Sequence, residues 1–417
     1  MTRFWHPVAD MSAVAASGEL ILERGEGVHV WDESGRRYLD ATGALWYCNV
    51  GYGRDEIVDA AMAQMRRLPA YSHYGDVSTR STTDLADRIA AVAPMDDAVV
   101  FFASGGGESI ETAVKLVRRY WSLLGRAEKT IVVSRERAYH GLAGYGTSLV
   151  GLDAFTVGVG PLAGGTLQVP WDDSGTLAAA IDEAGPEHVA AFFCEPIIGA
   201  GGVLLPPPGY LEEARRVCRE RDVLFVADEV ICGFCRVGDW FASTRFGLEP
   251  DLVTFAKGIT SGYLPLGGVI VSGRVREPFW TSGAGVWRHG YTYSGHATAT
   301  AAAHANLDIM EREALAERAI GLEAELAEAL APLAASPLVS EIRAGLGVVA
   351  AVQLSADALA GDPAIADRVV AAAREHGVLA RGLAGGSVQI SPALTIDADG
   401  LAELAGGLGA ALDAVSG

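Results

Sequence analysis

Two charged side chains stand directly after short apolar runs in the middle of the chain. Val223–Ala227 leads into Asp228, and Leu252–Ala256 leads into Lys257. Runs that are this short and rich in β-branched and aromatic residues predict strands buried on both faces of a parallel sheet. Ligands bind beyond the carboxyl ends of such strands. We therefore expect Asp228 and Lys257 to lie at one binding edge.

Lys257 has a chemistry that the other cations of this chain lack. The chain has only three lysines, Lys115, Lys129 and Lys257, so arginine supplies 29 of its 32 basic residues. Arginine keeps its proton in proteins, whereas a desolvated lysine can lose it, and only an amine forms a Schiff base. Lys257 is therefore a candidate nucleophile. The alternative is a structural ion pair between Lys257 and a nearby acid.

Composition limits the class of protein. A length of 417 residues fits two or three domains, or one large domain with a satellite, and half of the residues are hydrophobic. The net charge of −20 argues against nucleic acid and anionic membranes as partners. Five cysteines, an odd number, suit a reducing compartment. With no apolar signal segment and no run long enough to span a bilayer, we expect a cytoplasmic protein.

A glycine triplet lies between an expected strand and an expected helix. Ala98–Ala103 predicts a strand, Ser104-Gly-Gly-Gly107 follows it, and Glu108–Trp121 predicts a helix. Free N–H groups at such a helix start can hold a phosphate, and glycines let the backbone approach closely. No Gly-Lys-Ser/Thr follows, so this is not a Walker loop. An ordinary turn is the alternative.

Strands and helices alternate through the rest of the core. This alternation predicts a doubly wound α/β core followed by an α+β satellite from Glu311 onward. The expected elements are a hairpin at Gly27–Trp31 and Arg37–Asp40, helices at Asp55–Arg67, Ser81–Val92, Tyr210–Asp222 and Ala297–Met310, and strands at Thr130–Ser134, Val189–Cys194, Gly347–Gln353 and Val388–Ser391. Arg381 is expected in a loop of the satellite that faces the core.

Three further motifs have a functional and a structural interpretation. Trp46, in the loop Leu45–Gly53, could form one face of a pocket, and Tyr139 could supply a stacking ring, although both could simply be packed. Cys232-Gly-Phe-Cys235 matches a redox or half-metal spacing. Because no second pair completes a tetrahedral site, we interpret it as coincidence and expect no metal.

Together these motifs resemble the class III pyridoxal-phosphate aminotransferases of fold type I, over nearly the whole chain. Within that class, the resemblance is to the ω-amino acid and amine:pyruvate branch. The motifs are Leu45–Gly53, Ser104–Lys115, Tyr139–Gly141, Glu195–Gly202, Asp228–Gly238, Phe255–Gly268, Tyr291–His296 and Ile390–Leu394. The resemblance implies a large, doubly wound, mostly parallel α/β domain at 53–310. It also implies a smaller α+β domain built from residues 1–52 and 311–417.

The resemblance also implies the cofactor, pyridoxal 5'-phosphate, and its contacts. Lys257 becomes the Schiff-base lysine, and Asp228 the carboxylate that keeps the ring nitrogen protonated. Lys257 then acts as general base for the donor's Cα proton. The other implied contacts are Tyr139 and Val230 on the two ring faces, Gly106 and Gly107 on the phosphate, Glu195 near the ring hydroxyl, and Thr292 on the phosphate of the neighbouring subunit.

The contact from Thr292 implies a homodimer with shared active sites. Arg381 is the candidate for the keto acid's carboxylate by bidentate pairing, while Trp46 and Tyr71 suggest an apolar wall for the amine donor. We expect a transaminase that passes an amino group from an amine or ω-amino acid to a keto acid by a ping-pong mechanism. The alternatives are an aminomutase or racemase on the same fold, and a non-catalytic dimer.

The sequence departs from the family pattern at four positions. Gly107 stands where many relatives have serine, which removes one hydroxyl contact to phosphate. Ala200 stands where relatives of the ornithine and GABA type have a glutamate that neutralises the switching arginine. This second departure favours pyruvate over 2-oxoglutarate as acceptor. Ala297 and Ala393 replace prolines.

Overall fold

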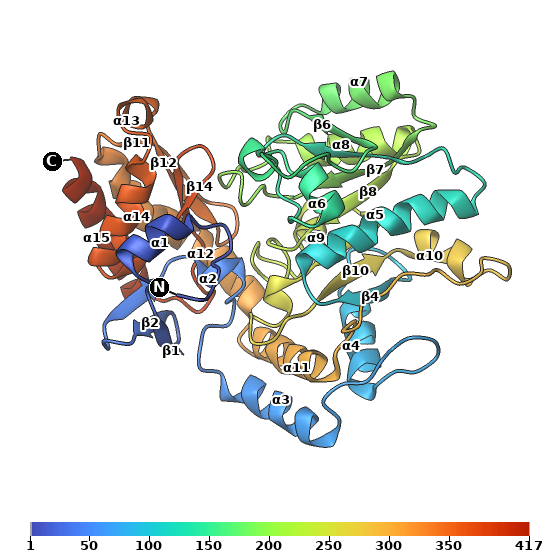
Figure 1. Ribbon diagram of the computed structural model, residues 1–417, viewed down its shortest axis with the longest axis horizontal. Coiled ribbons are helices and arrows are strands. Elements are labelled where there is room, and N and C mark those ends of the chain that lie inside the picture. The colour runs from blue at the N-terminus through green and yellow to red at the C-terminus, as the bar shows by residue number, and fades with distance from the viewer. Residues whose placement is uncertain (1, 417) are drawn as a thin grey trace.

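The computed structural model describes residues 2–416 and has two lobes (Figure 1). The larger lobe is built on a seven-stranded sheet in the order β4-β10-β9-β8-β7-β5-β6, in which only β10 is antiparallel to its neighbours. The mostly parallel α/β core expected from the sequence is therefore confirmed. The strands are β4 (Val99–Ala103), β5 (Ile131–Arg135), β6 (Thr166–Val169), β7 (Val189–Cys194), β8 (Leu224–Asp228), β9 (Leu252–Phe255) and β10 (Gly267–Val271).

Alternate residues of the central strands point to opposite faces of this sheet. Leu224 and Val226 of β8 pack in the cluster that contains α5, whereas Phe225 and Ala227 pack in the main core. Helices cover both faces, as continuous apolar strands require. One face carries α5 (Gly106–Leu123), α6 (Gly144–Leu149) and α10 (Gly273–Trp280). The main core on the other face takes in α4 (Arg80–Ala91), α7 (Ser174–Ala184), α8 (Tyr210–Glu220) and α11 (Ala297–Arg312), and α3 (Asp55–Arg67) packs on α11.

The smaller lobe joins the two ends of the chain. Strand β3 of the N-terminal hairpin pairs in parallel with β13 of the C-terminal segment, in the sheet β1-β2-β3-β13. A second sheet has the order β11-β12-β15-β14. The strands are β1 (Leu22–Glu26), β2 (His29–Asp32), β3 (Arg37–Asp40), β11 (Val339–Arg343), β12 (Ala350–Leu354), β13 (Val378–Leu379), β14 (Arg381–Leu383) and β15 (Ser387–Ile390).

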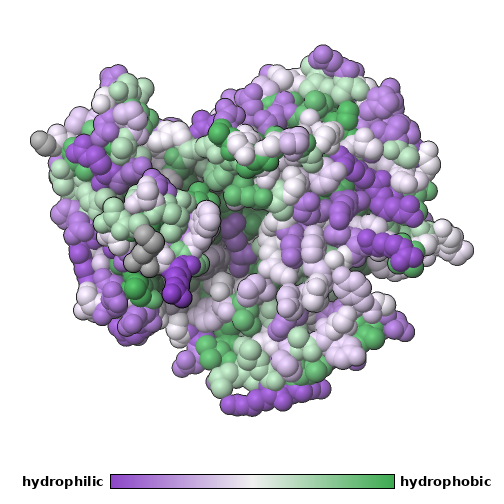
Figure 2. Space-filling model, in the orientation of Figure 1, coloured by the Kyte–Doolittle hydropathy of each residue, from purple (hydrophilic) through white to green (hydrophobic). Residues whose placement is uncertain are grey.

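Helices complete this lobe, and the surface is hollowed where it meets the larger one (Figure 2). They are α1 (Met11–Ser17), α2 (Gly43–Trp46), α12 (Leu315–Leu330), α13 (Ala356–Gly361), α14 (Ile365–Glu375) and α15 (Ala398–Ser416). The lobe is the α+β domain expected from the N- and C-terminal segments. The limits 1–52, 53–310 and 311–417 stay a prediction. Within residues 2–416, no helix is both long and apolar enough to cross a bilayer.

Two local expectations were wrong. The helix after the glycine triplet begins at Gly106 rather than at Glu108, because small residues can start a helix where free N–H groups are useful. Arg381 is the first residue of strand β14, paired with Gln389, and not part of a loop. A strand of three residues that contains Gly382 has too little apolar alternation to be recognised in the sequence.

Candidate active site

One small cavity of about 150 Å³ lies at the carboxyl ends of the central strands. It brings together most of the side chains that the sequence singled out, from segments up to 151 residues apart along the chain. The site residues predicted from the sequence that line it are Gly106, Gly107, Tyr139, Glu195, Asp228, Val230 and Lys257. His140, Gly141, Ile110 and Ile231 complete the lining.

Lys257 is held at the cavity by a strained turn. It follows β9 and has φ of 45°, in the left-handed region that costs a non-glycine residue about 1–2 kcal/mol. The turn is fixed by Asn306, whose side-chain amide donates to the carbonyls of Gly258 and Ile259 at 2.9 Å each. A β-carbon at Gly258 would lie 2.6 Å from Asn49 Nδ2, so only glycine fits there. These contacts fix where the Lys257 side chain leaves the backbone.

The Lys257 amine is easier to deprotonate than an ordinary lysine. Burial lowers its pKa, and the nearby charge of Arg381 lowers it further, while Asp228 and Glu195 oppose the shift. The lowered pKa increases the fraction of neutral amine, which is the form that attacks a carbonyl or accepts a proton.

Asp228 has one acceptor position left for a ligand. Its Oδ1 accepts from the N–H of Val230 at 3.1 Å and from the Thr254 hydroxyl at 3.0 Å. Its Oδ2 lies 2.6 Å from Nδ1 of His140, which must carry the proton because an ionised carboxylate only accepts. Each carboxylate oxygen accepts about two hydrogen bonds. One position on Oδ2 therefore stays open to a cationic N–H in the cavity.

His140 is a site residue that sequence reasoning did not single out. It is only 1% exposed, and its Nε2 has no hydrogen-bond partner within the described residues. No separate sequence signal marks His140, because the pair Tyr139-His140 was interpreted for its aromatic ring alone. The contact to Asp228 joins residues 88 positions apart and depends on the parallel order of the strands.

A hydrogen bond joins the side chain of Glu195 to the backbone of Tyr139. Glu195 Oε1 accepts from the N–H of Tyr139 at 2.9 Å, and Oε2 accepts from the N–H of Gly199 at 3.0 Å. Burial raises the pKa of Glu195. The Tyr139 ring lines the cavity and meets Phe155 edge to face, at 5.5 Å between centroids. The carboxylate thus holds the loop that carries the ring.

The glycines form an open cradle at the start of α5. A β-carbon at Gly106 would lie 3.0 Å from Val230 Cγ1, whereas one at Gly107 would meet nothing within 4 Å. The first N–H groups of this 18-residue helix have no partner inside the helix, and its dipole favours an anion there. A phosphate fits this end of the cavity.

The acid next to Asp228 serves the fold. Glu229 is fully buried, and its two oxygens accept from the N–H groups of Ala242 and Ser243 at 2.7 and 2.6 Å, which caps the short helix α9 (Ala242–Phe246). Burial raises its pKa to about 7. The Asp228-Glu229 pair therefore divides its roles between the cavity and the scaffold.

Four predicted residues lie outside the cavity lining. Arg381 is half-buried and close enough for its charge to act on Tyr139 and Lys257. Within residues 2–416, no carboxylate pairs with its guanidinium. Trp46 is buried in an apolar cluster with Ile231 and stands behind the cavity wall. Tyr71 is 59% exposed and Thr292 is also exposed, so neither reaches the cavity of its own chain.

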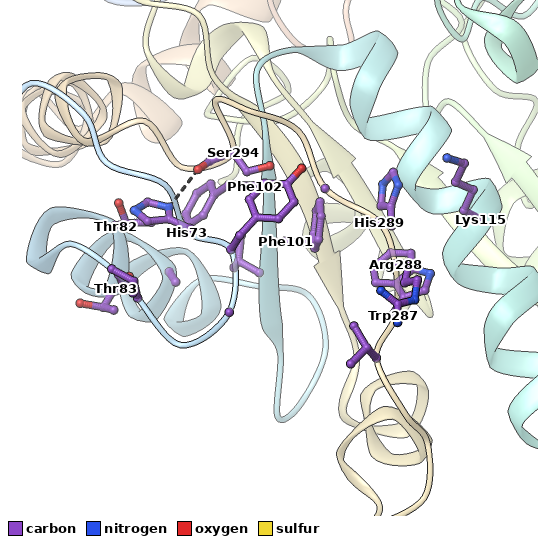
Figure 3. A pocket seen from close by; sticks show the side chains of 18 residues that line it. His73, Thr82, Thr83, Phe101, Phe102, Lys115, Trp287, Arg288, His289 and Ser294 are labelled. Atoms are coloured by element: carbon purple, nitrogen blue, oxygen red, sulfur yellow. Dashed lines mark hydrogen bonds between the residues drawn. The ribbon is translucent and has the colours of Figure 1, made fainter.

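A larger hollow of about 750 Å³ lies apart from this cavity (Figure 3). Along one wall Phe101 stacks on His289 and meets Trp287 edge to face, and Lys115 reaches toward His289 from α5. Burial and the charge of Lys115 lower the pKa of His289 to about 4. Tyr74, at its rim, is exposed. The hollow shares no lining residue with the cavity that contains Lys257.

The model of one protein family, the aminotransferase class-III family, matches residues 12–412. The chain is a class III aminotransferase. It is 40% identical to putrescine–pyruvate aminotransferase of Pseudomonas aeruginosa over 95% of this chain and 91% of that protein. It also resembles the solved structure of a transaminase from the marine bacterium Virgibacillus, with 36% identity, a TM-score of 0.95, and coverage of 99% and 97% of the two chains.

The cofactor of this class III aminotransferase is pyridoxal 5'-phosphate. The ω-transaminase of Pseudomonas jessenii in complex with PMP is 33% identical, with a TM-score of 0.94 and coverage of 99% of this chain and 96% of that one. The cavity suits this group, because it offers an amine, a carboxylate with one open acceptor position, an aromatic ring and a helix start for phosphate.

Proposed function

We propose that the protein is an amine:pyruvate transaminase that takes an amine or ω-amino acid as donor and works by a ping-pong mechanism. The observation that carries the proposal is the placement of Lys257 and Asp228 on one small cavity in a class III chain. Donor and keto acid would use this cavity in turn, because both must present the same carbon to the same lysine.

The bound cofactor supplies an electron-accepting ring and an aldehyde carbon, and the residues of the cavity bind it, orient it and move the proton. Asp228, held by His140 and Thr254, would keep the ring nitrogen protonated through its open acceptor position. Lys257, with its lowered pKa, would take the proton from the donor's Cα and pass it to the cofactor's former aldehyde carbon. Tyr139 and Val230 would hold the ring between them.

Three further roles follow the same pattern. Gly106 and Gly107 would hold the phosphate through their N–H groups, and Glu195 would stand near the ring hydroxyl. Trp46 and Tyr71 stay our candidates for an apolar wall toward the donor. Trp46 would act through Ile231, against which its cluster packs.

Pyruvate as the acceptor is supported by the charges around Arg381. This guanidinium has no carboxylate partner within the described residues, so it is available to a keto acid. Ala200 offers no acid that could hold Arg381 aside, unlike the glutamate of the 2-oxoglutarate-using relatives considered above. The similarity to a relative named for putrescine and pyruvate supports the same choice.

We also propose a homodimer. The lining of the larger hollow includes exposed apolar side chains such as Tyr74 and Val286, which is 76% exposed. A second copy on this face would cover them and would bring Thr292 and Tyr71 to the partner's cavity. The five free, buried thiols suit work in the cytoplasm.

A donor panel tests the proposal. Purified enzyme would be mixed with one amine at a time, without acceptor, and the visible absorbance of the cofactor followed. Pyruvate or 2-oxoglutarate would then be added. We expect amines to change the spectrum and release a carbonyl product, and pyruvate to restore the spectrum faster than 2-oxoglutarate does. Conversion without a free keto acid or aldehyde product would favour an aminomutase or racemase instead.

A further inference from the structure

Arg137, two residues before Tyr139, has an unusual backbone. Its φ is 66°, in the left-handed region that glycine or asparagine occupies more easily. Arginine in this conformation costs about 1–2 kcal/mol. Residues in such strained positions persist where the surrounding structure requires them, often beside active sites. The reason for an arginine at position 137 must therefore lie in the contacts that its guanidinium makes.

The guanidinium of Arg137 lies among glycines. Its Nε and Nη2 both donate to the carbonyl of Gly201, at 3.1 and 2.6 Å. A β-carbon at Gly202 would lie 3.1 Å from Nη2, and one at Gly385 only 2.9 Å from it. Gly201 and Gly202 belong to the larger domain, whereas Gly385 lies in the turn between β14 and β15 of the smaller domain. Arg137 thus contacts both domains where they meet.

Two side chains of the smaller domain close the contacts into a ring. Arg343 donates through Nη2 to the carbonyl of Gly202 at 2.7 Å and to Gln353 Oε1 at 2.9 Å. Gln353 in turn donates through Nε2 to the carbonyl of Gly385 at 2.7 Å. Gln353 therefore binds the turn that contains Gly385 within its own domain, and the Arg137 guanidinium lies against Gly385 from across the junction.

The positive charges of Arg137 and Arg343 raise the free-energy cost of this ring of contacts, so stability alone does not explain it. Burial lowers the pKa of Arg137, and so does the like charge of Arg343. In the described part of the chain, no carboxylate pairs with Arg137. Arg343 is paired with Glu341 at 2.7 Å, whereas the half-buried charge of Arg137 is not paired, so a neutral side chain in place of Arg137 would join these carbonyls at a lower desolvation cost. The ring is better explained by the position that it gives to the turn.

The turn determines where Arg381 lies. Strand β14 has only three residues, from Arg381 to Leu383, so Arg381 stands about 10 Å from the turn at about 3.3 Å per residue. The strand lies on the side of the smaller domain that faces the larger one (Figure 1). Tyr139 follows Arg137 by two residues and feels the charge of Arg381. Arg137 therefore links the two walls of the site.

We propose that Arg137 is a positioning residue that sets the place from which Arg381 meets the carboxylate of the keto acid. It does so by fixing the β14–β15 turn against the loop of Tyr139. The inference rests on the proposed role of Arg381 as the carboxylate-binding residue. It assigns Arg137 no contact with the reacting atoms.

The test uses Arg137→Asn in the holoenzyme, because asparagine tolerates the same backbone conformation but lacks the fork of N–H groups. The two half-reactions are measured separately by stopped-flow absorbance, with an amine donor and with pyruvate. We expect the concentration of pyruvate for half-maximal rate to rise about tenfold or more, since small displacements near the chemistry are costly. The donor half-reaction and the melting temperature should change little.

Two further variants separate positioning from a general loss of structure. Gly385→Ala pushes a β-carbon against Nη2 from the opposite domain and should give the same loss specific to the acceptor. Glu249→Asn relaxes a similar backbone, with φ of 44°, at an exposed position away from the cavity and should change neither half-reaction. In an Arg381→Ala background, Arg137→Asn should have no further effect on pyruvate.

Equal losses in both half-reactions, or full additivity with Arg381→Ala, would overturn the inference. The failure of the proposed function would look different. In that case the wild-type enzyme itself would give no spectral change with amines, or none with pyruvate.

Discussion

Gly107→Ser should tighten the binding of pyridoxal phosphate. A β-carbon at this position meets nothing within 4 Å, and the residue lies in the first turn of α5, so a serine hydroxyl can face the phosphate without displacing a neighbour. A hydrogen bond to a charged group contributes about 1.5–3 kcal/mol. Ordering the serine side chain costs roughly 0.5–1 kcal/mol. The net gain of about 1–2 kcal/mol corresponds to a dissociation constant roughly 5–30 times lower.

Gly106→Ser is the matched control, one residue earlier in the same turn. Its β-carbon would lie 3.0 Å and 3.3 Å from the two methyl carbons of Val230, which forms the opposite wall of the cavity. The methyl groups must move into the space that the ring needs. We therefore expect weaker binding of the cofactor from the same chemical change.

The assay is a titration of apoprotein with pyridoxal phosphate, followed by fluorescence and by the visible absorbance of the bound form. Inorganic phosphate is added as a competitor, and it should compete better with the cofactor in Gly107→Ser than in the wild type. If Gly107→Ser leaves the dissociation constant unchanged, or if Gly106→Ser binds equally well, the phosphate does not lie at this end of α5.

Three other changes test the site and the scaffold. Lys257→Ala should reduce turnover at least about 100-fold while the protein still binds cofactor and amine, measured by absorbance. His140→Phe removes the donor to Asp228 and should lower kcat about tenfold or more, whereas His140→Asn, which keeps a donor near the place of Nδ1, should be milder; equal effects would exclude this contact from catalysis. Glu229 has its pKa raised from 4.5 to about 7, so the native state holds a proton that the unfolded chain has released between these values. The free energy of unfolding should therefore fall by about 3 kcal/mol as the pH rises from about 4.5 to 7, and urea titrations of Glu229→Gln should lack this slope.

The central strands and their charged ends could be predicted because the signal is local. Val223–Ala227 is a continuous apolar run and Leu252–Ala256 is interrupted only by Thr254, and β8 and β9 lie within one residue of them at each end. Parallel strands end at the same edge of the sheet, so Asp228 and Lys257 meet there. The chemistry of the side chains and the parallel order of the strands were together sufficient to predict where Asp228 and Lys257 lie.

The remaining positions depend on contacts that are distant in the sequence. The short strand β14 exists because it pairs with β15, so Arg381 could not be recognised as part of a strand. His140 gains its role from Asp228, and Arg137 from Gly201 and Gly385, none of which lies nearby in the chain. Tyr71 is exposed in the single chain, and its predicted role needs a second copy.

The strained residues show why local preference could not locate the site in full. Trp46, Arg137 and Lys257 have φ of 68°, 66° and 45°, and all three lie in or beside the walls of one cavity. Each conformation opposes the local preference of its residue by about 1–3 kcal/mol, so contacts elsewhere must offset it. Asp40 offsets the strain before Trp46 by accepting from the N–H groups of Thr42 and Ala44.

Asn306 does the same at Lys257, through the carbonyls of Gly258 and Ile259. At Arg137 the backbone N–H donates to the carbonyl of Gly151 at 2.8 Å, and the guanidinium donates to the carbonyl of Gly201. At Lys257 and Arg137 the contacts come from other segments, whereas Asp40 lies in the same segment as Trp46. Strain in the walls of the cavity is thus offset by contacts within the scaffold, while similar backbones also occur away from the cavity, as at Glu249. A variant that relaxes such a backbone should stabilise the fold locally while it displaces the side chain that the strain was holding in place.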